Sequence, residues 1–225
     1  MTSTPQSQAR AAAAIRGSLR DAPRITAPWR YWLPCDLLPA ELAAAAAALP
    51  FPTPAIDDTG GKRETHNAQR IFVSEATRTR HPACQDLADA FQDPATVALI
   101  EDLTGTALGG HFLRIECCLD TDGFWLEPHT DIGAKMLTLL IYLSDHPDAA
   151  QWGTDVMDAA GTVHATAPGV FNAGLMFVPG ADTWHGFTRR RIDGVRRSLI
   201  VNYVTPAWRS RHELAFPHQP VIAAR

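Results

Sequence analysis

From residue 111 onward the sequence consists of short apolar and β-branched segments separated by turn signals. Eight such segments can be drawn, at residues 111–119, 124–129, 135–144, 154–157, 162–167, 174–178, 183–188 and 196–204. The turn signals between them include Asp122-Gly123, Ala160-Gly161 and Asp193-Gly194. Short strands at this even spacing are typical of an antiparallel sandwich or jelly roll. This half of the chain therefore predicts a mainly β fold.

The first hundred residues have a different character, because their composition favours helices. We expect helices at residues 7–20, 38–49, 81–91 and 94–103, the last of them ending at Gly105. Residues 51–61 are rich in Pro and Gly and indicate a loop, and residues 68–74 fit a short strand. Helices followed by strands favour an arrangement in which the helices cover one outer face of the sheets.

The length of 225 residues suits one domain. We divide it into a mostly helical supporting part at residues 1–107, a β core at residues 108–206, and a C-terminal helix and tail at residues 207–225. Within the core, residues 135–144 alternate between Leu137, Leu139 and Ile141 on one face and Thr138 and Tyr142 on the other. A strand that is mostly apolar on both faces is expected to be covered on both.

Charge and composition exclude several classes of function. The net charge is −4 and the isoelectric point about 6.1, so the basic surface of a nucleic-acid-binding protein is absent. No apolar run approaches the length of a membrane span, and the N-terminus does not resemble a signal peptide. Four cysteines, at positions 35, 84, 117 and 118, contain no CxxC pair. We therefore expect reduced thiols and a cytoplasmic protein without membrane or nucleic-acid partners.

The most informative motif is His129-Thr130-Asp131, which is followed by His185 54 residues after the aspartate. Residues two apart on an extended chain point to the same side, so His129 and Asp131 are expected to face one space. Both histidines lie at the ends of predicted strands. Two imidazoles and one carboxylate form the facial triad that holds a ferrous ion and leaves further coordination positions open.

The last predicted strand carries a second signal. Alternation places Arg196, Ser198 and Asn202 on one face and Arg197 on the other. A guanidinium facing the interior requires an anionic partner, and its planar fork suits a carboxylate bound through both oxygens. The partner is either a bound ligand or an internal acid such as Glu116, and the sequence leaves both open.

These residues together resemble the Fe(II)- and 2-oxoglutarate-dependent dioxygenases, nearest to their prolyl-4-hydroxylase-like branch. The resemblance covers about residues 108–206 and combines the HxD motif, the distal histidine and an Arg-x-Ser strand eleven residues beyond it. It implies a double-stranded β-helix, a cupin-like jelly roll, with helices packed on one sheet. It also implies Fe(II) as cofactor, and 2-oxoglutarate and O2 as co-substrates.

Residue roles follow from the same resemblance. His129, Asp131 and His185 would be the catalytic iron ligands, and Arg196 with Ser198 would bind the distal carboxylate of 2-oxoglutarate. Tyr142 matches a tyrosine that contacts the same carboxylate in this branch. The implied reaction hydroxylates an unactivated C–H bond of a small molecule or a peptidyl side chain, with release of succinate and CO2.

Four further residues are candidates for substrate contact. Trp125 and Glu127 share the face of His129 by strand parity, and Glu127 is alternatively an acceptor for a ligand histidine. Arg114 shares a face with Glu116, so the two form either an ion pair or part of the site. Asn202 faces inward as a polar contact.

Two other functions fit the same architecture. One is a cupin-like metal-dependent isomerase or lyase, whose sites draw on more histidines. The other is a non-catalytic jelly-roll module that binds sugar or peptide, which predicts no tight iron binding and no role for an inward Arg196. The substrate, the position oxidised and the oligomeric state do not follow from the sequence.

Overall fold

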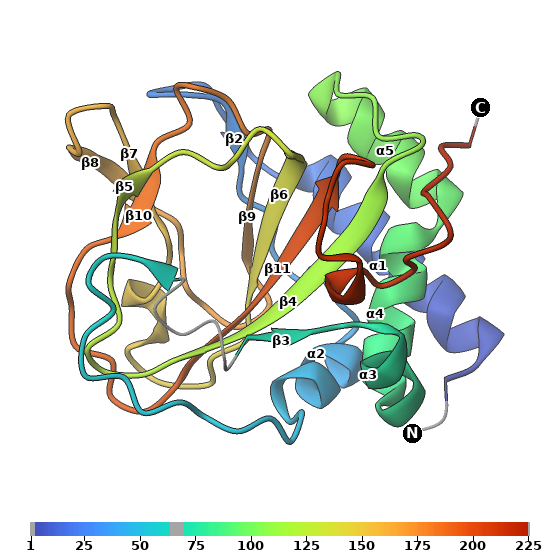
Figure 1. The fold of residues 1–225 in the computed structure, drawn as a ribbon, viewed down its shortest axis with the longest axis horizontal. Coiled ribbons are helices and arrows are strands. Elements are labelled where there is room, and N and C mark those ends of the chain that lie inside the picture. The colour runs from blue at the N-terminus through green and yellow to red at the C-terminus, as the bar shows by residue number, and fades with distance from the viewer. Residues whose placement is uncertain (1–2, 64–69, 225) are drawn as a thin grey trace.

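The computed structural model describes residues 3–63 and 70–224, and these residues form two antiparallel β-sheets with helices against one of them (Figure 1). The larger sheet has seven strands in the order β1-β2-β9-β6-β11-β4-β3, and the smaller has four in the order β5-β10-β7-β8. Every one of the eight predicted segments forms a strand. Their bounds are β4 Phe112–Asp120, β5 Leu126–His129, β6 Lys135–Tyr142, β7 Asp155–Met157, β8 Val163–Thr166, β9 Gly174–Phe177, β10 His185–Phe187 and β11 Arg196–Val204.

The fold class expected from the sequence, a jelly roll with N-terminal helices packed on one sheet, is confirmed. Strand β11 lies between β4 and β6, with Val201 opposite Ile115 on one side and Leu139 on the other. These three side chains are fully buried against the helices. The alternate residues of the same strands, among them Arg114 and Arg196, face the smaller sheet, as alternation predicts.

The described residues form five α-helices, of which α1, α2, α4 and α5 pack on the outer face of the larger sheet and α3 packs against α4 (Figure 1). Proline occupies the first position of α1, α4 and α5, where its missing N–H has no helical partner to lose. Helix α5 ends at Gly105, whose φ of 77° is in the left-handed region that glycine adopts without strain. The bounds are α1 Pro5–Asp21, α2 Ala40–Ala47, α3 Glu75–Arg80, α4 Pro82–Gln92 and α5 Pro94–Thr104.

The N-terminal part also contributes strands to the larger sheet. The strands β1 (Arg24–Ile25) and β2 (Tyr31–Trp32) add one edge, where β2 pairs with β9. Strand β3 (Ile71–Phe72) adds the other edge beside β4 and lies in the predicted strand at residues 68–74, of which residues 68 and 69 are outside the described residues. Helix α3 was not expected, and it begins at the capping side chain of Ser74.

The C-terminal helix predicted within residues 207–225 is wrong. Residues 207–224 contain a single 3-10 turn, η3 (Arg211–Glu213), and otherwise run along the start of β4. The Ala215 N–H donates to the Leu113 carbonyl at 2.9 Å, and the Val221 N–H donates to the His111 carbonyl at 2.8 Å. The sheet edge therefore satisfies these backbone groups in place of a helix.

Two further expectations concern the cysteines and the membrane. All four cysteines are free thiols, and Cys84, Cys117 and Cys118 are buried. Within residues 3–63 and 70–224, no helix has the length and apolar character needed to cross a bilayer.

Candidate active site

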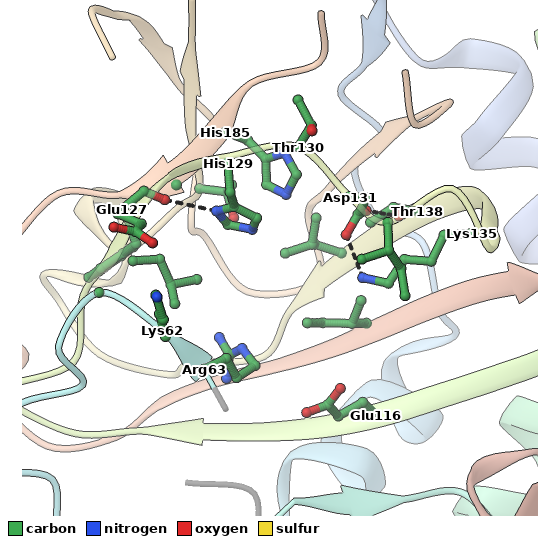
Figure 2. A pocket seen from close by; sticks show the side chains of 18 of the residues that line it. Lys62, Arg63, Glu116, Glu127, His129, Thr130, Asp131, Lys135, Thr138 and His185 are labelled. Atoms are coloured by element: carbon green, nitrogen blue, oxygen red, sulfur yellow. Dashed lines mark hydrogen bonds and ion pairs between the residues drawn. The ribbon is translucent and has the colours of Figure 1, made fainter. Parts of the chain in front are cut away.

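A cavity of about 360 Å³ lies between the two sheets. Its walls come from the inner face of β4, β6 and β11, from β5 and β10 of the smaller sheet, and from the loop at residues 61–63 (Figure 2). This loop runs beside β5, because the Glu127 N–H donates to the Gly61 carbonyl at 3.0 Å. Sites of ligand binding are typically concave spaces of this kind, lined by a few convergent polar groups.

The two predicted histidine ligands lie together in this cavity. His129 ends β5, His185 begins β10, and the two residues are direct partners in the antiparallel pairing. Their ring centroids are 4.4 Å apart. Gly186 permits the close approach of the two strands, since a Cβ there would lie 2.9 Å from the Leu126 carbonyl oxygen.

Each imidazole is held by the backbone through Nδ1. The Nδ1 of His129 lies 2.8 Å from the Glu127 carbonyl oxygen, and that of His185 lies 2.9 Å from the Thr183 carbonyl oxygen. A carbonyl only accepts, so Nδ1 carries the proton and Nε2 keeps a free lone pair. Burial lowers the pKa of His185 to about 4, so this ring is neutral at pH 7. Both rings are therefore prepared to donate a lone pair.

The third predicted ligand, Asp131, contacts Lys135 and Thr138 and not the two histidines. Its carboxylate accepts from the Lys135 ammonium at 2.5 Å and from the Thr138 hydroxyl at 2.6 Å (Figure 2). Burial alone would raise the pKa of Asp131, but the charge of Lys135, the neighbouring His185 and these two hydrogen bonds bring it to about 2. The carboxylate is thus ionised at neutral pH.

The triad expected from the sequence is therefore only partly assembled. Among the described residues, no three His, Cys, Asp or Glu side chains are arranged as a metal site. The donor chemistry nevertheless fits Fe(II), because two imidazoles with a free lone pair on Nε2 and one ionised carboxylate share the cavity. Asp131 completes the set only if its carboxylate moves toward the two imidazoles.

Arg196, at the start of β11, is buried with its side chain 3% exposed. Its guanidinium donates to Asp120 at 2.5 Å and to the Trp152 carbonyl at 2.6 Å. The alternative of an internal acid is thus observed in this structure, with Asp120 in place of Glu116. Asp120 also accepts from Arg63 at 2.9 Å, so two guanidiniums converge on one carboxylate. This end of the cavity has one more cation than it has anions to pair with.

The two residues expected to assist Arg196 lie opposite one another on neighbouring strands, Ser198 on β11 and Tyr142 on β6. The Ser198 Oγ is buried and has no hydrogen-bond partner among the described residues. The Tyr142 hydroxyl accepts from the Thr154 N–H at 3.1 Å, which leaves its own proton free to donate. A surplus guanidinium and two hydroxyl donors are the groups that a bound carboxylate requires. Of the three, only Arg196 lines the cavity, and Ser198 and Tyr142 lie beside it on β11 and β6. We call Arg196, Ser198 and Tyr142 the carboxylate end of the cavity.

Two of the predicted substrate contacts have different roles in the structure. Trp125 precedes β5 and does not line the cavity; its Nε1 donates to Asp58 at 2.5 Å, and Arg189 lies 5.1 Å from its ring centroid. Trp125 lies outside the cavity wall because β5 begins at Leu126, so the alternation of side chains along the strand does not include Trp125. Glu127 does line the cavity, but it supports His129 through its backbone carbonyl, not through its carboxylate.

The other two, Arg114 and Asn202, belong to one buried network. Arg114 donates to Glu116 at 2.8 Å, to Glu213 at 2.6 Å and to the Asn202 side-chain oxygen at 3.1 Å. The Arg114–Glu116 ion pair is therefore confirmed. Asn202 in turn donates to Thr138 at 2.9 Å, and Thr138 donates to Asp131. The network connects the wall of the cavity to the predicted metal ligand.

Sequence reasoning missed several charged groups of the cavity wall. Arg70 donates to both oxygens of Glu116, at 2.8 and 2.7 Å, and Arg63 contacts Asp120. Both arginines come from the N-terminal part, where no motif indicated a site. Lys135 and Trp208 were missed as well, since neither stands at a recognisable spacing from the motif.

Three solved structures show which proteins share this fold. A prolyl-4-hydroxylase of Pseudomonas putida matches with 18% identity and a TM-score of 0.52, over 91% of this chain and 98% of that chain. A prolyl hydroxylase of Trichoplax adhaerens, in complex with a hypoxia inducible factor peptide fragment, matches with 12% identity and a TM-score of 0.55, over 88% and 91%. A 2OG-Fe(II) oxygenase family protein of Burkholderia pseudomallei matches with 17% identity and a TM-score of 0.53, over 91% and 93%.

These likenesses establish the class of fold. The chain has the fold of the prolyl-4-hydroxylases and of other 2-oxoglutarate/Fe(II) oxygenases, as its sequence motifs suggested. At identities of 12–18% the likeness concerns the fold, not the substrate or the reaction. No family model matches the sequence, and no curated protein matches it.

Proposed function

We propose that this protein is an Fe(II)- and 2-oxoglutarate-dependent dioxygenase that hydroxylates an unactivated C–H bond. One observation carries the proposal: a pair of imidazoles with free lone pairs and a carboxylate-binding end with a surplus guanidinium share one cavity. The first suits a metal and the second suits a dicarboxylic co-substrate.

His129 and His185 would hold the iron through Nε2, together with the carboxylate of Asp131. Bound iron with 2-oxoglutarate supplies the activation of dioxygen, with release of succinate and CO2. The protein contributes positioning: the carbonyls of Glu127 and Thr183 fix the rings, and Thr138 orients Asp131.

At the carboxylate end, Arg196 would bind the distal carboxylate of 2-oxoglutarate. Asp120 keeps Arg63 as a partner when Arg196 turns to the ligand, so no buried charge is left alone. Ser198 and Tyr142 would donate to the same carboxylate, which would satisfy the hydroxyl that is unpaired in this structure.

The substrate is a small molecule or a peptidyl side chain. The peptide complex of the Trichoplax adhaerens prolyl hydroxylase supports a peptidyl substrate within this fold. A cytoplasmic location and the absence of nucleic-acid and membrane partners stay predictions of the sequence.

The test is an assay of succinate formation by purified, iron-loaded protein, with and without 2-oxoglutarate, across a library of candidate substrates. We expect slow succinate formation without substrate, strong stimulation by the true substrate, and one product oxygen derived from labelled dioxygen. Absence of 2-oxoglutarate consumption with every compound and with iron present would overturn the proposal.

The ion pair between Asp131 and Lys135 favours one second candidate, the non-catalytic binding module. A protein that never binds metal would retain this pair. Calorimetry with Fe(II) under anaerobic conditions separates the two, because the dioxygenase binds one equivalent and the module binds none. The cupin-like isomerase or lyase gains no such support, since only two histidines line the cavity among the described residues.

A further inference from the structure

The end of the cavity opposite Arg196 carries a polar group with no role so far. Strand β11 runs from Arg196 to Asn202 along the cavity, a rise of roughly 20 Å for six residues. Beyond the strand, the Thr205 N–H donates to the Ala134 carbonyl and the chain turns so that Trp208 lines the cavity. We call this end, formed by Lys135 and Trp208, the Trp208 end.

Trp208 presents a buried donor without an acceptor. Its indole Nε1 has no hydrogen-bond partner among the described residues. The guanidinium of Arg114 lies 5.2 Å from the ring centroid, and all three nitrogens of Arg114 already donate to other groups. A buried N–H without a partner destabilises the fold. A ligand that supplies an acceptor atom would remove this penalty.

Lys135 is the second group at this end. In this structure its ammonium is paired with Asp131. When Asp131 binds iron, its carboxylate shares its negative charge with the metal, so Lys135 is less well neutralised while its side chain stays largely buried, at 19% exposed. A desolvated ammonium of this kind needs another anion.

We propose that the substrate is a small organic acid whose carboxylate binds at the Trp208 end, between the Lys135 ammonium and the Trp208 indole N–H. This inference rests on the proposed function and names its substrate class. A cavity of about 360 Å³ that must also hold 2-oxoglutarate suits a molecule of amino-acid size. A neutral peptide segment would leave both donors without an anion.

The experiment compares matched pairs, each a small carboxylic acid or amino acid and its primary amide. Stimulated succinate formation and anaerobic calorimetry on protein loaded with Fe(II) and 2-oxoglutarate are both measured. We expect the acid of one pair to stimulate turnover and to bind at least roughly tenfold more tightly than its amide, as a hydrogen bond to a charged group predicts. Equal binding of acid and amide, or stimulation by neutral peptides alone, would overturn the inference.

Two variants locate the carboxylate. Trp208→Phe keeps the ring beside Arg114 and removes the N–H, and Lys135→Met removes the ammonium. Both should weaken binding of the acid at least roughly tenfold in anaerobic calorimetry and reduce the difference in affinity between acid and amide. Lys135→Arg should recover part of the affinity.

Arg209→Gln is the matched control, because it removes an exposed positive charge next to Trp208. It should leave the affinity for the acid unchanged. A loss of affinity as large as that of the Lys135 and Trp208 variants would show that general electrostatics explains the change, and it would refute the subsite. If the unmodified protein consumed no 2-oxoglutarate with any compound, the proposed function itself would be refuted. The two failures are therefore distinguishable.

Discussion

The two faces of the larger sheet are built from the same strands and differ in almost every property. The outer face carries side chains such as Ile115, Leu139 and Val201, which are fully buried against the helices. The inner face carries Arg114 and Arg196 at alternate positions, buried to a similar degree but charged. Apolar burial stabilises the fold, whereas buried charges cost stability unless each is paired. The outer face therefore stabilises the fold, and the inner face carries the charged groups to which the proposed function assigns ligand binding.

The largest expected effect comes from the histidines of the cavity between the two sheets. His129→Ala or His185→Ala should abolish activity and iron binding, because each removes one of the two imidazoles that face the cavity. The fold should remain, since the apolar outer face does not involve either ring. Anaerobic calorimetry with Fe(II) and circular dichroism check the two halves of this prediction. Unchanged iron affinity in either variant would remove that histidine from the proposed site.

Arg196→Ala, on the inner face, is expected to have the second largest effect. Loss of a buried charge pair costs about 3–5 kcal/mol, so the apparent requirement for 2-oxoglutarate should rise more than roughly a hundredfold. Arg197→Ala is the matched control, because Arg197 lies on the other face of β11 and is not among the cavity-lining residues. Succinate formation at increasing 2-oxoglutarate concentration measures both. If Arg197→Ala has the larger effect, the assignment of the two faces is wrong.

A truncation on the outer face should act on stability alone. Leu139→Ala removes a fully buried side chain from the cluster shared with the helices and should cost about 2–5 kcal/mol of unfolding free energy. Urea denaturation measures this loss. At a temperature where the variant is folded, its requirement for 2-oxoglutarate should match that of the unmodified protein. A large change in that requirement would break the separation of the two faces.

The smallest effect is a pH dependence of stability that comes from the inner face. Burial would raise the pKa of Glu116, but hydrogen bonding from Arg70 and the charges of Arg114, Arg70 and Arg63 lower it from 4.5 to about 2. A depressed pKa stabilises the folded state above the unfolded value and loses this contribution as the pH falls through the folded value. The unfolding free energy should therefore decrease between about pH 5 and pH 2, by up to about 3 kcal/mol from this group.

Glu116→Gln provides the control for this pH dependence. It should be less stable than the unmodified protein at pH 7 and should show a smaller decrease on acidification, because the amide does not titrate. Urea denaturation at several pH values measures both proteins. Parallel curves for the two would show that Glu116 contributes nothing to acid sensitivity.

Local pattern was sufficient to predict much of this protein. The eight core strands, the inward position of Arg196 and the shared face of Arg114 and Glu116 all depend on residue alternation and on turn residues. Each of these signals is contained within a few neighbouring residues. The resemblance of the motif then indicated the fold that the solved structures share.

The partners of the charged groups were decided by tertiary structure. Asp131 pairs with Lys135, Arg196 pairs with Asp120, and Trp208 returns to the cavity after β11. These contacts depend on the register of β4 against β11 and on loops that bring distant segments together. Several acids in the sequence satisfy the charge requirement of one arginine equally well. Alternation states which way a side chain points, but only the packing of the two sheets determines what it meets there.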